Sequence, residues 1–171
     1  MTNVSVPAIE YASRTSVALM ADSCIDLHNV SVRFAGRDVL QGITWQVQPC
    51  ERWVILGRNG CGKTTLLRTV SMYHHPTTGS VRILGELWGQ TYVRELRRHI
   101  GLVSSSLADL IRPDLRAFDV VLTARHGALE PWWHSYSDQD RARAQAEMER
   151  MQVAHLGEHS FISLSSGERQ R

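Results

Sequence analysis

Nine residues in the first half of the sequence have the types and spacing needed to bind a chain of phosphate groups. From Gly57 to Thr65 they read G-R-N-G-C-G-K-T-T. Glycines in such a loop let successive backbone N–H groups turn toward one anion, and a helix that starts there adds its positive dipole. Lys63 supplies a point charge for the outer phosphates, and the Thr64 hydroxyl can ligate Mg²⁺. The pattern therefore predicts a nucleotide-phosphate site.

The alternative is a merely structural glycine-rich turn, and the flanking residues argue against it. The apolar run at 54–56 predicts a short buried parallel strand, and residues 66–67 belong to a helix that begins near Gly62. Strand, loop and helix in this order are the setting that the motif requires. A dinucleotide-binding glycine pattern fails because Thr65 stands where its third glycine should be. We expect the phosphates to be bound by Gly57, Arg58, Asn59, Gly60, Cys61, Gly62, Lys63, Thr64 and Thr65, with Thr64 as the metal ligand.

The bulk composition is that of one globular domain in water. The chain has 171 residues, of which 43% are hydrophobic and 21% charged, so it can bury a sizeable core. Its 19 basic and 17 acidic residues nearly balance, and composition gives no argument for nucleic acid as a partner. Three cysteines without metal-ligand spacing predict reduced thiols in the cytosol. We find neither a membrane-spanning apolar run nor a signal sequence, and expect a cytoplasmic location.

Apolar periodicity predicts an α/β fold with an antiparallel β strip and a mainly parallel core sheet. Residues 1–23 are small and polar, which is typical of a flexible tail. Alternation of apolar residues predicts a strand over 25–34 that is broken by a register change, and a turn at 35–38 follows. Further strands are expected at about 42–48, 80–84 and 100–103, and a helix at 92–99.

Beyond about residue 110 the sequence becomes helical in character. Helices are predicted over 117–126 and 137–153, the second opened by a Ser-Asp start signal. Between them, residues 131–136 read P-W-W-H-S-Y. This aromatic stretch is interpreted either as a local packing cluster or as a contact surface for a partner.

The end of the sequence carries a second motif. Residues 164–171 read L-S-S-G-E-R-Q-R and resemble the L-S-G-G-Q-x-Q-R signature of the ATP-binding cassette (ABC) ATPases. The phosphate loop is likewise similar to that family's G-x-N-G-x-G-K-[ST]-T form, and the resemblance runs from about Ile25 to the last residue. It implies a P-loop NTPase with a RecA-like part over about 24–110 and a helical subdomain that carries the signature over about 111–171.

The resemblance also implies further nucleotide contacts. Phe34 matches the aromatic residue that stacks on adenine, and Ser105 stands where the family usually has a glutamine that reaches Mg²⁺ and the attacking water. The serine side chain is too short for that contact. In the signature, Ser166 replaces a glycine and Glu168 replaces the glutamine. The resemblance assigns nucleotide binding to Ser165, Ser166, Gly167 and Glu168. Of these, Ser165 and the Gly167 N–H are expected to face a γ-phosphate bound to a second cassette.

The resemblance implies an ATP-binding subunit that couples hydrolysis of Mg-ATP to transport through separate membrane permease subunits, at the inner face of the cell membrane. In the family, the acidic strand, the catalytic glutamate and the switch histidine follow the signature. We therefore expect a cassette that is incomplete at the C-terminus, whose general base is not among these residues and which is inactive alone. The alternatives are a soluble ABC ATPase that acts on ribosomes or nucleic acid, and a non-hydrolysing nucleotide-binding fragment.

Overall fold

The structure, a computed structural model, describes residues 22–171, apart from the side chains of residues 105 and 106. This part of the chain forms two compact units. The first comprises the described residues up to Cys61 together with Pro76–Gly89, and the second comprises Gly62–His75 and Gln90–Arg171. The tail expected at 1–23 lies almost wholly outside the described residues. The expected division near residue 110 stays a prediction.

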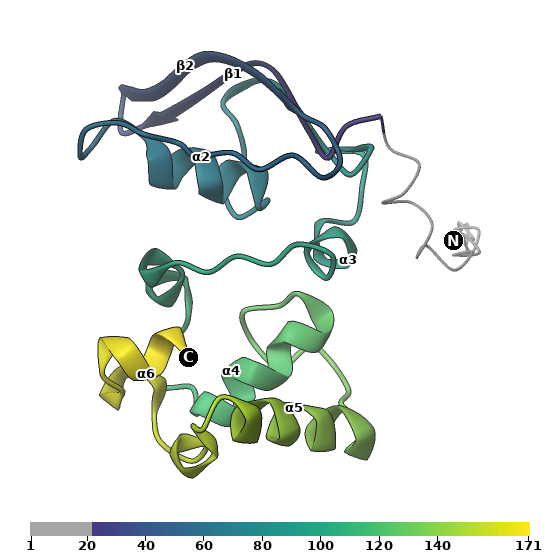
Figure 1. The fold of residues 1–171 in the computed structure, drawn as a ribbon, viewed down its shortest axis with the longest axis vertical. Helices are drawn as coiled ribbons and strands as arrows, with labels where there is room; N and C mark the ends of the chain where they lie inside the picture. Colours follow the sequence, from purple (N-terminus) through teal and green to yellow (C-terminus); the bar gives the residue numbers. More distant parts are fainter. Residues whose placement is uncertain (1–21) are drawn as a thin grey trace, which may run out of the picture. The chain divides into compact units, whose positions relative to one another are not determined.

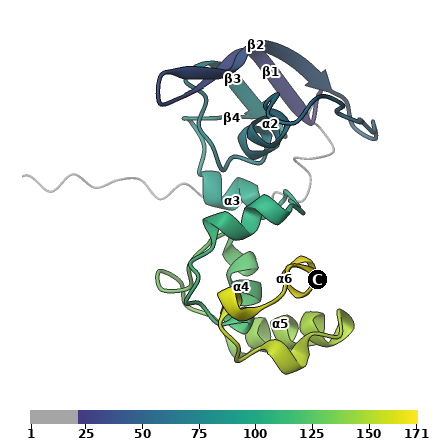
Figure 2. The ribbon, with the colours of Figure 1, turned by 90° about the vertical axis from the view of Figure 1, so that its left-hand side faces the viewer.

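The first unit is a four-stranded sheet in the order β2-β1-β3-β4, in which all neighbours are antiparallel (Figures 1 and 2). This confirms the predicted antiparallel strip, and register shifts after Leu27 confirm the predicted break in the first strand. The second strand begins earlier than predicted because the turn needs only Ala35 and Gly36. The strands are β1 Ile25–Phe34, β2 Arg37–Val47, β3 Thr78–Ile83 and β4 Glu86–Leu87.

Alternating apolar side chains bury one face of this sheet. Leu27, Val30 and Val32 of β1 are fully buried, and Val81 of β3 is nearly so. Gly79 allows β3 to approach β1, because its φ is +88° and a Cβ there would lie 2.4 Å from the Asn29 carbonyl oxygen. No larger residue fits this position without a backbone shift.

The second unit is helical. The helices α4 and α5 pack side by side (Figure 1) and share a core of Ala117, Met148, Val153, Leu156, Phe161 and Leu164. Ser137 caps α5 through a reciprocal pair of hydrogen bonds with Asp140, which confirms the predicted Ser-Asp start. The α-helices are α2 Lys63–Val70, α3 Val93–Arg97, α4 Ala117–Thr123, α5 Asp138–Arg150 and α6 Ser166–Gln170. The 3₁₀ helices are η2 Ser105–Leu110, η3 Ala124–His126, η4 Ala154–Leu156 and η5 Phe161–Ser163.

Two segments that the sequence predicts as buried parallel strands form no strand in this structure. Residues 51–58 and 100–104 belong to no helix or strand, and the side chains of Val54, Leu56 and Val103 are 79%, 86% and 88% exposed. The prediction was wrong for both segments. Parallel strands depend on neighbours for their hydrogen bonds and for cover on both faces, and every pairing among residues 22–171 is antiparallel.

Two stacked histidines lie half-buried in the helical unit. The rings of His126 and His134 are 4.3 Å apart with an 8° angle between their planes, and Tyr136 meets His126 edge-on at 5.2 Å. Both imidazole Nε2 atoms and the tyrosine hydroxyl are buried without a hydrogen-bond partner among the residues described. Removal of the imidazole from water lowers the pKa of His134, and the neighbouring charges of His126 and Arg94 lower it further.

We expect this lowered pKa to make the helical unit less stable in mild acid. Below pH 6.5 the unfolded chain binds protons more readily than the folded one, so stability falls as the pH falls through that window. Replacement of His134 by glutamine should shrink the change in urea midpoint between pH 7.5 and pH 5.5, whereas His159→Gln, at an exposed position, should leave the change intact. An equal effect of both substitutions would contradict this origin.

Candidate functional site

The first half of the phosphate loop closes as a tight turn in the sheet unit. The Cys61 N–H donates to the Arg58 carbonyl oxygen at 3.3 Å, and Gly60 within this turn has a φ of +81°. Gly57 is needed for a different reason, because a Cβ there would lie 2.6 Å from the Cys61 Sγ. Left-handed backbone and close approach are both properties that the motif requires of its glycines.

The second half of the loop becomes the N-terminus of α2. Gly62 is the N-cap residue with a φ of 95°, and the Leu66 N–H donates to its carbonyl oxygen at 2.8 Å as the first bond of the helix. The N–H groups of Lys63, Thr64 and Thr65 come before this first bond in the sequence. The first N–H groups of an α-helix have no carbonyl partner within the helix, so they can bind a ligand. The first turn carries no acidic residue. The helix dipole and Lys63 together therefore favour an anion here.

The residues present fit a magnesium ion that is bound mainly by the nucleotide. Among residues 22–171, no cluster of three or more His, Cys, Asp or Glu side chains could hold a metal ion. Thr64 is exposed in the first turn of α2, directly after Lys63. Mg²⁺ commonly keeps few protein ligands and takes the rest from water and phosphate oxygens. The Thr64 hydroxyl would be its ligand from this part of the chain.

Phe34 ends β1 at the tip of the first hairpin. Its side chain is 44% exposed, and the turn after it contains Ala35 and Gly36. The hairpin is tied by an ion pair between Arg33 and Asp38, whose Nε and Oδ1 atoms are 2.5 Å apart. An aromatic side chain held on such a hairpin offers a surface on which a nucleobase could stack. Its role toward adenine stays a prediction.

The signature residues start α6 with a complete capping box. The Ser165 N–H donates to the Glu168 Oε2 at 2.7 Å, and the Glu168 N–H donates to the Ser165 Oγ at 3.4 Å. The hydrogen bonds from Ser165 lower the pKa of the Glu168 carboxyl group. Glu168, which the sequence analysis considers only as a glutamine replacement and a nucleotide contact, therefore also fixes the start of α6. The pattern S-x-x-E could have revealed this role without a structure.

A buried anchor holds the exposed end of the signature. Phe161 and Leu164 lie in the helical core, whereas Ser165, Ser166 and Gly167 are exposed. Arg169 supports this arrangement, because it donates to the Ile162 carbonyl oxygen and its guanidinium carbon lies 5.6 Å from the centre of the Phe161 ring. The Ser165 side chain is itself engaged with Glu168 through the capping box.

The position of Ser105 is described for its backbone only. Ser105 opens η2, which packs against α6, and its side chain lies outside the described part. A cavity of about 220 Å³ is lined by both helices and includes Leu107, Ser166 and Arg169. The structure thus brings the helix that Ser105 begins beside the signature helix. The contact of Ser105 with a nucleotide stays a prediction.

The known proteins that resemble this chain in sequence are described as ATP-binding proteins of transporters. The family model described as ABC transporter matches residues 40–171. The uncharacterized ABC transporter ATP-binding protein YlmA of Bacillus subtilis (strain 168) is 35% identical over 86% of this chain and 56% of its own length. The hemin import ATP-binding protein HmuV of Gloeobacter violaceus is 35% identical over 83% of this chain and 50% of its own length. The chain spans about half the length of these relatives.

Solved structures show the same fold. The dimeric structure of MJ0796, a bacterial ABC transporter cassette, matches with a TM-score of 0.64 and 24% identity, over 85% of this chain and 65% of that one. The structure of cbiO1 from Clostridium perfringens, part of the cbiONQ transporter complex, matches with a TM-score of 0.57 and 22% identity, over 88% of this chain and 59% of that one. The chain thus has the α/β fold of the P-loop NTPase cassettes and covers part of it. Together with the phosphate loop and the signature segment, the family model shows that this protein belongs to the ABC transporter ATP-binding family.

Proposed function

We propose that this chain belongs to the ATP-binding subunit of an ABC transporter, which binds Mg-ATP and couples its hydrolysis to transport through separate membrane subunits. The observation that carries the proposal is the phosphate loop itself. Gly60 and Gly62 have left-handed backbone, and Lys63 and Thr64 occupy the first turn of α2. Relatives named as import ATP-binding proteins for hemin and for phosphonates support transport as the process.

The residues act by electrostatic positioning. The N–H groups at the start of α2 and the Lys63 ammonium hold the phosphate oxygens, and Mg²⁺ when bound neutralises charge that develops during phosphoryl transfer. The exposed Ser165 hydroxyl and Gly167 N–H would approach the γ-phosphate bound to a second cassette. The dimeric state named for the MJ0796 cassette supports such a partner.

Two finer points belong to the same proposal. We infer that residues 1–171 bind ATP but do not turn it over alone, because the family resemblance assigns the general base to a strand after the signature, and such a base contributes typically 10²- to 10⁴-fold in rate. We also infer a peripheral position at the inner face of the cell membrane. Among residues 22–171, the structure has no helix with the length and apolar character that a membrane crossing needs, so attachment would depend on the membrane subunits.

A comparison of two ligands tests the nucleotide assignment at Phe34. Phe34→Ala should weaken binding of ATP about tenfold, because stacking of a base on an aromatic ring is worth roughly 1 to 3 kcal/mol. Binding of inorganic triphosphate should not change, since that ligand has no base. The measurement is competition with a fluorescent ATP analogue, and Trp133→Ala, which removes an exposed aromatic side chain from the helical unit, is the control. Equal losses for both ligands would remove Phe34 from the site.

A further inference from the structure

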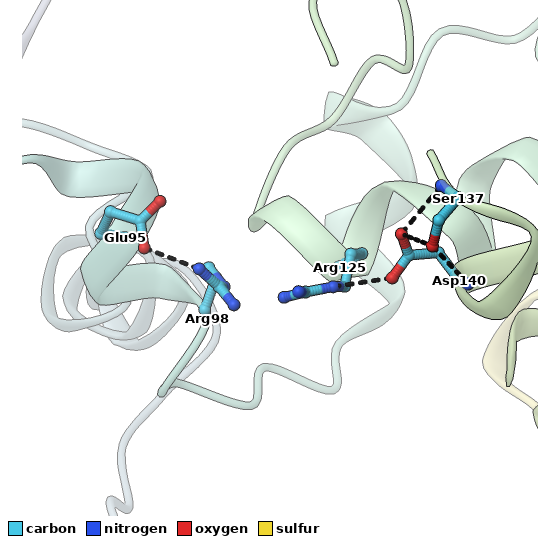
Figure 3. A network of polar contacts seen from close by, with 5 residues as sticks. All are labelled: Glu95, Arg98, Arg125, Ser137 and Asp140. Atoms are coloured by element: carbon cyan, nitrogen blue, oxygen red, sulfur yellow. Dashed lines mark hydrogen bonds and ion pairs between the residues drawn. The ribbon is translucent and has the colours of Figure 1, made fainter. Parts of the chain in front are cut away.

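Two arginines of the helical unit point their guanidinium groups toward one another. Arg98 follows the last turn of α3, and Arg125 lies in η3 (Figure 3). Each is held from behind by a carboxylate: Arg98 donates to the Glu95 Oε2 at 2.7 Å, and Arg125 donates through its Nε to the Asp140 Oδ1 at 2.8 Å. In Figure 3 the terminal nitrogens of Arg125 extend away from Asp140 toward Arg98. Like charges in this arrangement repel unless an anion lies between them.

A cavity of about 330 Å³ lies at this place. Its charged lining consists of Arg98, Arg125, Asp140 and Arg143, and the apolar part of its wall includes Val121. Arg143 stands one turn after Asp140 on α5, and no ion pair or hydrogen bond of its side chain occurs within the described part of the chain. Three guanidinium groups, from the C-terminal end of α3, from η3 and from α5, therefore surround one cavity whose volume falls in the range of small-molecule sites.

The positive charge of the residues that line this cavity favours an anionic ligand. The three arginines and one aspartate of the lining sum to +2, and the charge stays positive, at +1, when Glu95, the partner of Arg98, is counted as well. Asp140 contributes its negative charge throughout the physiological range, because hydrogen bonds from the Ser137 hydroxyl and N–H, and then the bond from Arg125, lower its pKa to about 2. A phosphate monoester carries a charge of about −1.5 to −2 at pH 7 and offers three strong acceptor oxygens. A carboxylate offers only two oxygens and one charge, so it matches three guanidinium groups less well.

We propose that this cavity binds a phosphate monoester group, held by Arg98, Arg125 and Arg143. The remaining volume and the apolar wall accommodate a small organic group attached to the phosphate. A bound ligand would cross-link α3, η3 and α5 and thereby stiffen the helical unit. The proposal concerns residues outside the phosphate loop and the signature, and it stands independently of the nucleotide function.

The experiment uses glycerol 3-phosphate as the probe and the whole 171-residue chain. Binding is followed by the backbone amide signals of α3, η3 and α5 in a nuclear magnetic resonance titration. Arg143→Gln and Arg98→Gln should each raise the dissociation constant about tenfold, as expected for the loss of one charge-assisted contact. The matched control is Arg141→Gln, which removes an exposed arginine from the same helix without touching the cavity lining and should change nothing.

Two further arms identify the source of the phosphate. Glycerol should not bind, since it lacks the charge. Vesicles that contain phosphatidate test a lipid source, and vesicle binding with the same dependence on Arg98 and Arg143 would support the phosphate chemistry while assigning it to a lipid headgroup. Signal shifts that are equally weakened by Arg141→Gln would overturn the proposal, because they would reflect general positive charge. Absence of shifts in α3, η3 and α5, with a thermal melt showing a folded chain, would overturn it as well.

Discussion

Replacement of Lys63 by alanine is expected to weaken ATP binding about 10- to 100-fold. Lys63 is the only lysine in the sequence and stands in the first turn of α2, directly after the N-cap Gly62. Loss of a charge-assisted contact to a phosphate costs roughly 1.5 to 3 kcal/mol, and 1.4 kcal/mol corresponds to a factor of ten. Titration with a fluorescent ATP analogue measures the change. Arg52→Ala, which removes an exposed positive charge elsewhere, should leave the affinity unchanged.

Two additional readouts sharpen this result. Thr64→Ala should lose only the magnesium-dependent part of the affinity, because its hydroxyl acts through the metal ion.

Since Lys63 carries the only side-chain amine, an amine-reactive label should mark it, and ATP should slow that labelling. Phosphate release by the unsubstituted chain should not exceed that of Lys63→Ala. Unchanged nucleotide affinity in both the Lys63 and the Thr64 variants would contradict the phosphate-loop assignment.

The second large expected effect is self-association of the chain through the irregular segments 51–58 and 100–104, which expose apolar side chains. Val54, Leu56 and Val103 are among the most exposed apolar side chains of the described residues, and the segments that carry them have backbone groups outside any sheet. Segments that lie outside a sheet and expose apolar side chains can pair with other chains. We expect sedimentation velocity to show association that increases with protein concentration. Leu56→Lys and Val103→Lys should each reduce it strongly, because a charge on such a segment opposes pairing.

The control for this prediction is Ile162→Lys. Ile162 is also exposed, at 61%, but it lies in the short 3₁₀ helix η5. If exposed hydrophobicity alone caused association, this substitution would be as effective as the other two. A chain that stays monomeric at all concentrations would contradict the expected association. Equal effects of all three lysine substitutions would contradict its assignment to segments 51–58 and 100–104.

The elements that the sequence predicts best are those that depend on neighbours in the chain. The break in β1 near Leu27, the start of α2 at Gly62 and the capped start of α5 at Ser137 agree with the structure. Each is determined by turn preferences, glycine backbone or a side chain that bonds three residues away, and these are properties of short segments. The phosphate loop and the signature were recognisable for the same reason.

What only the tertiary structure decided concerns groups that are far apart in the sequence. The apolar runs at 54–56 and 100–103 have the composition of buried strands, yet burial depends on partner strands that their own residues do not specify. Arg98, Arg125 and Arg143 look like ordinary surface arginines in the sequence, and they surround one cavity only because α3, η3 and α5 converge. Side-chain convergence and strand pairing are long-range interactions, so local periodicity carries no information about them.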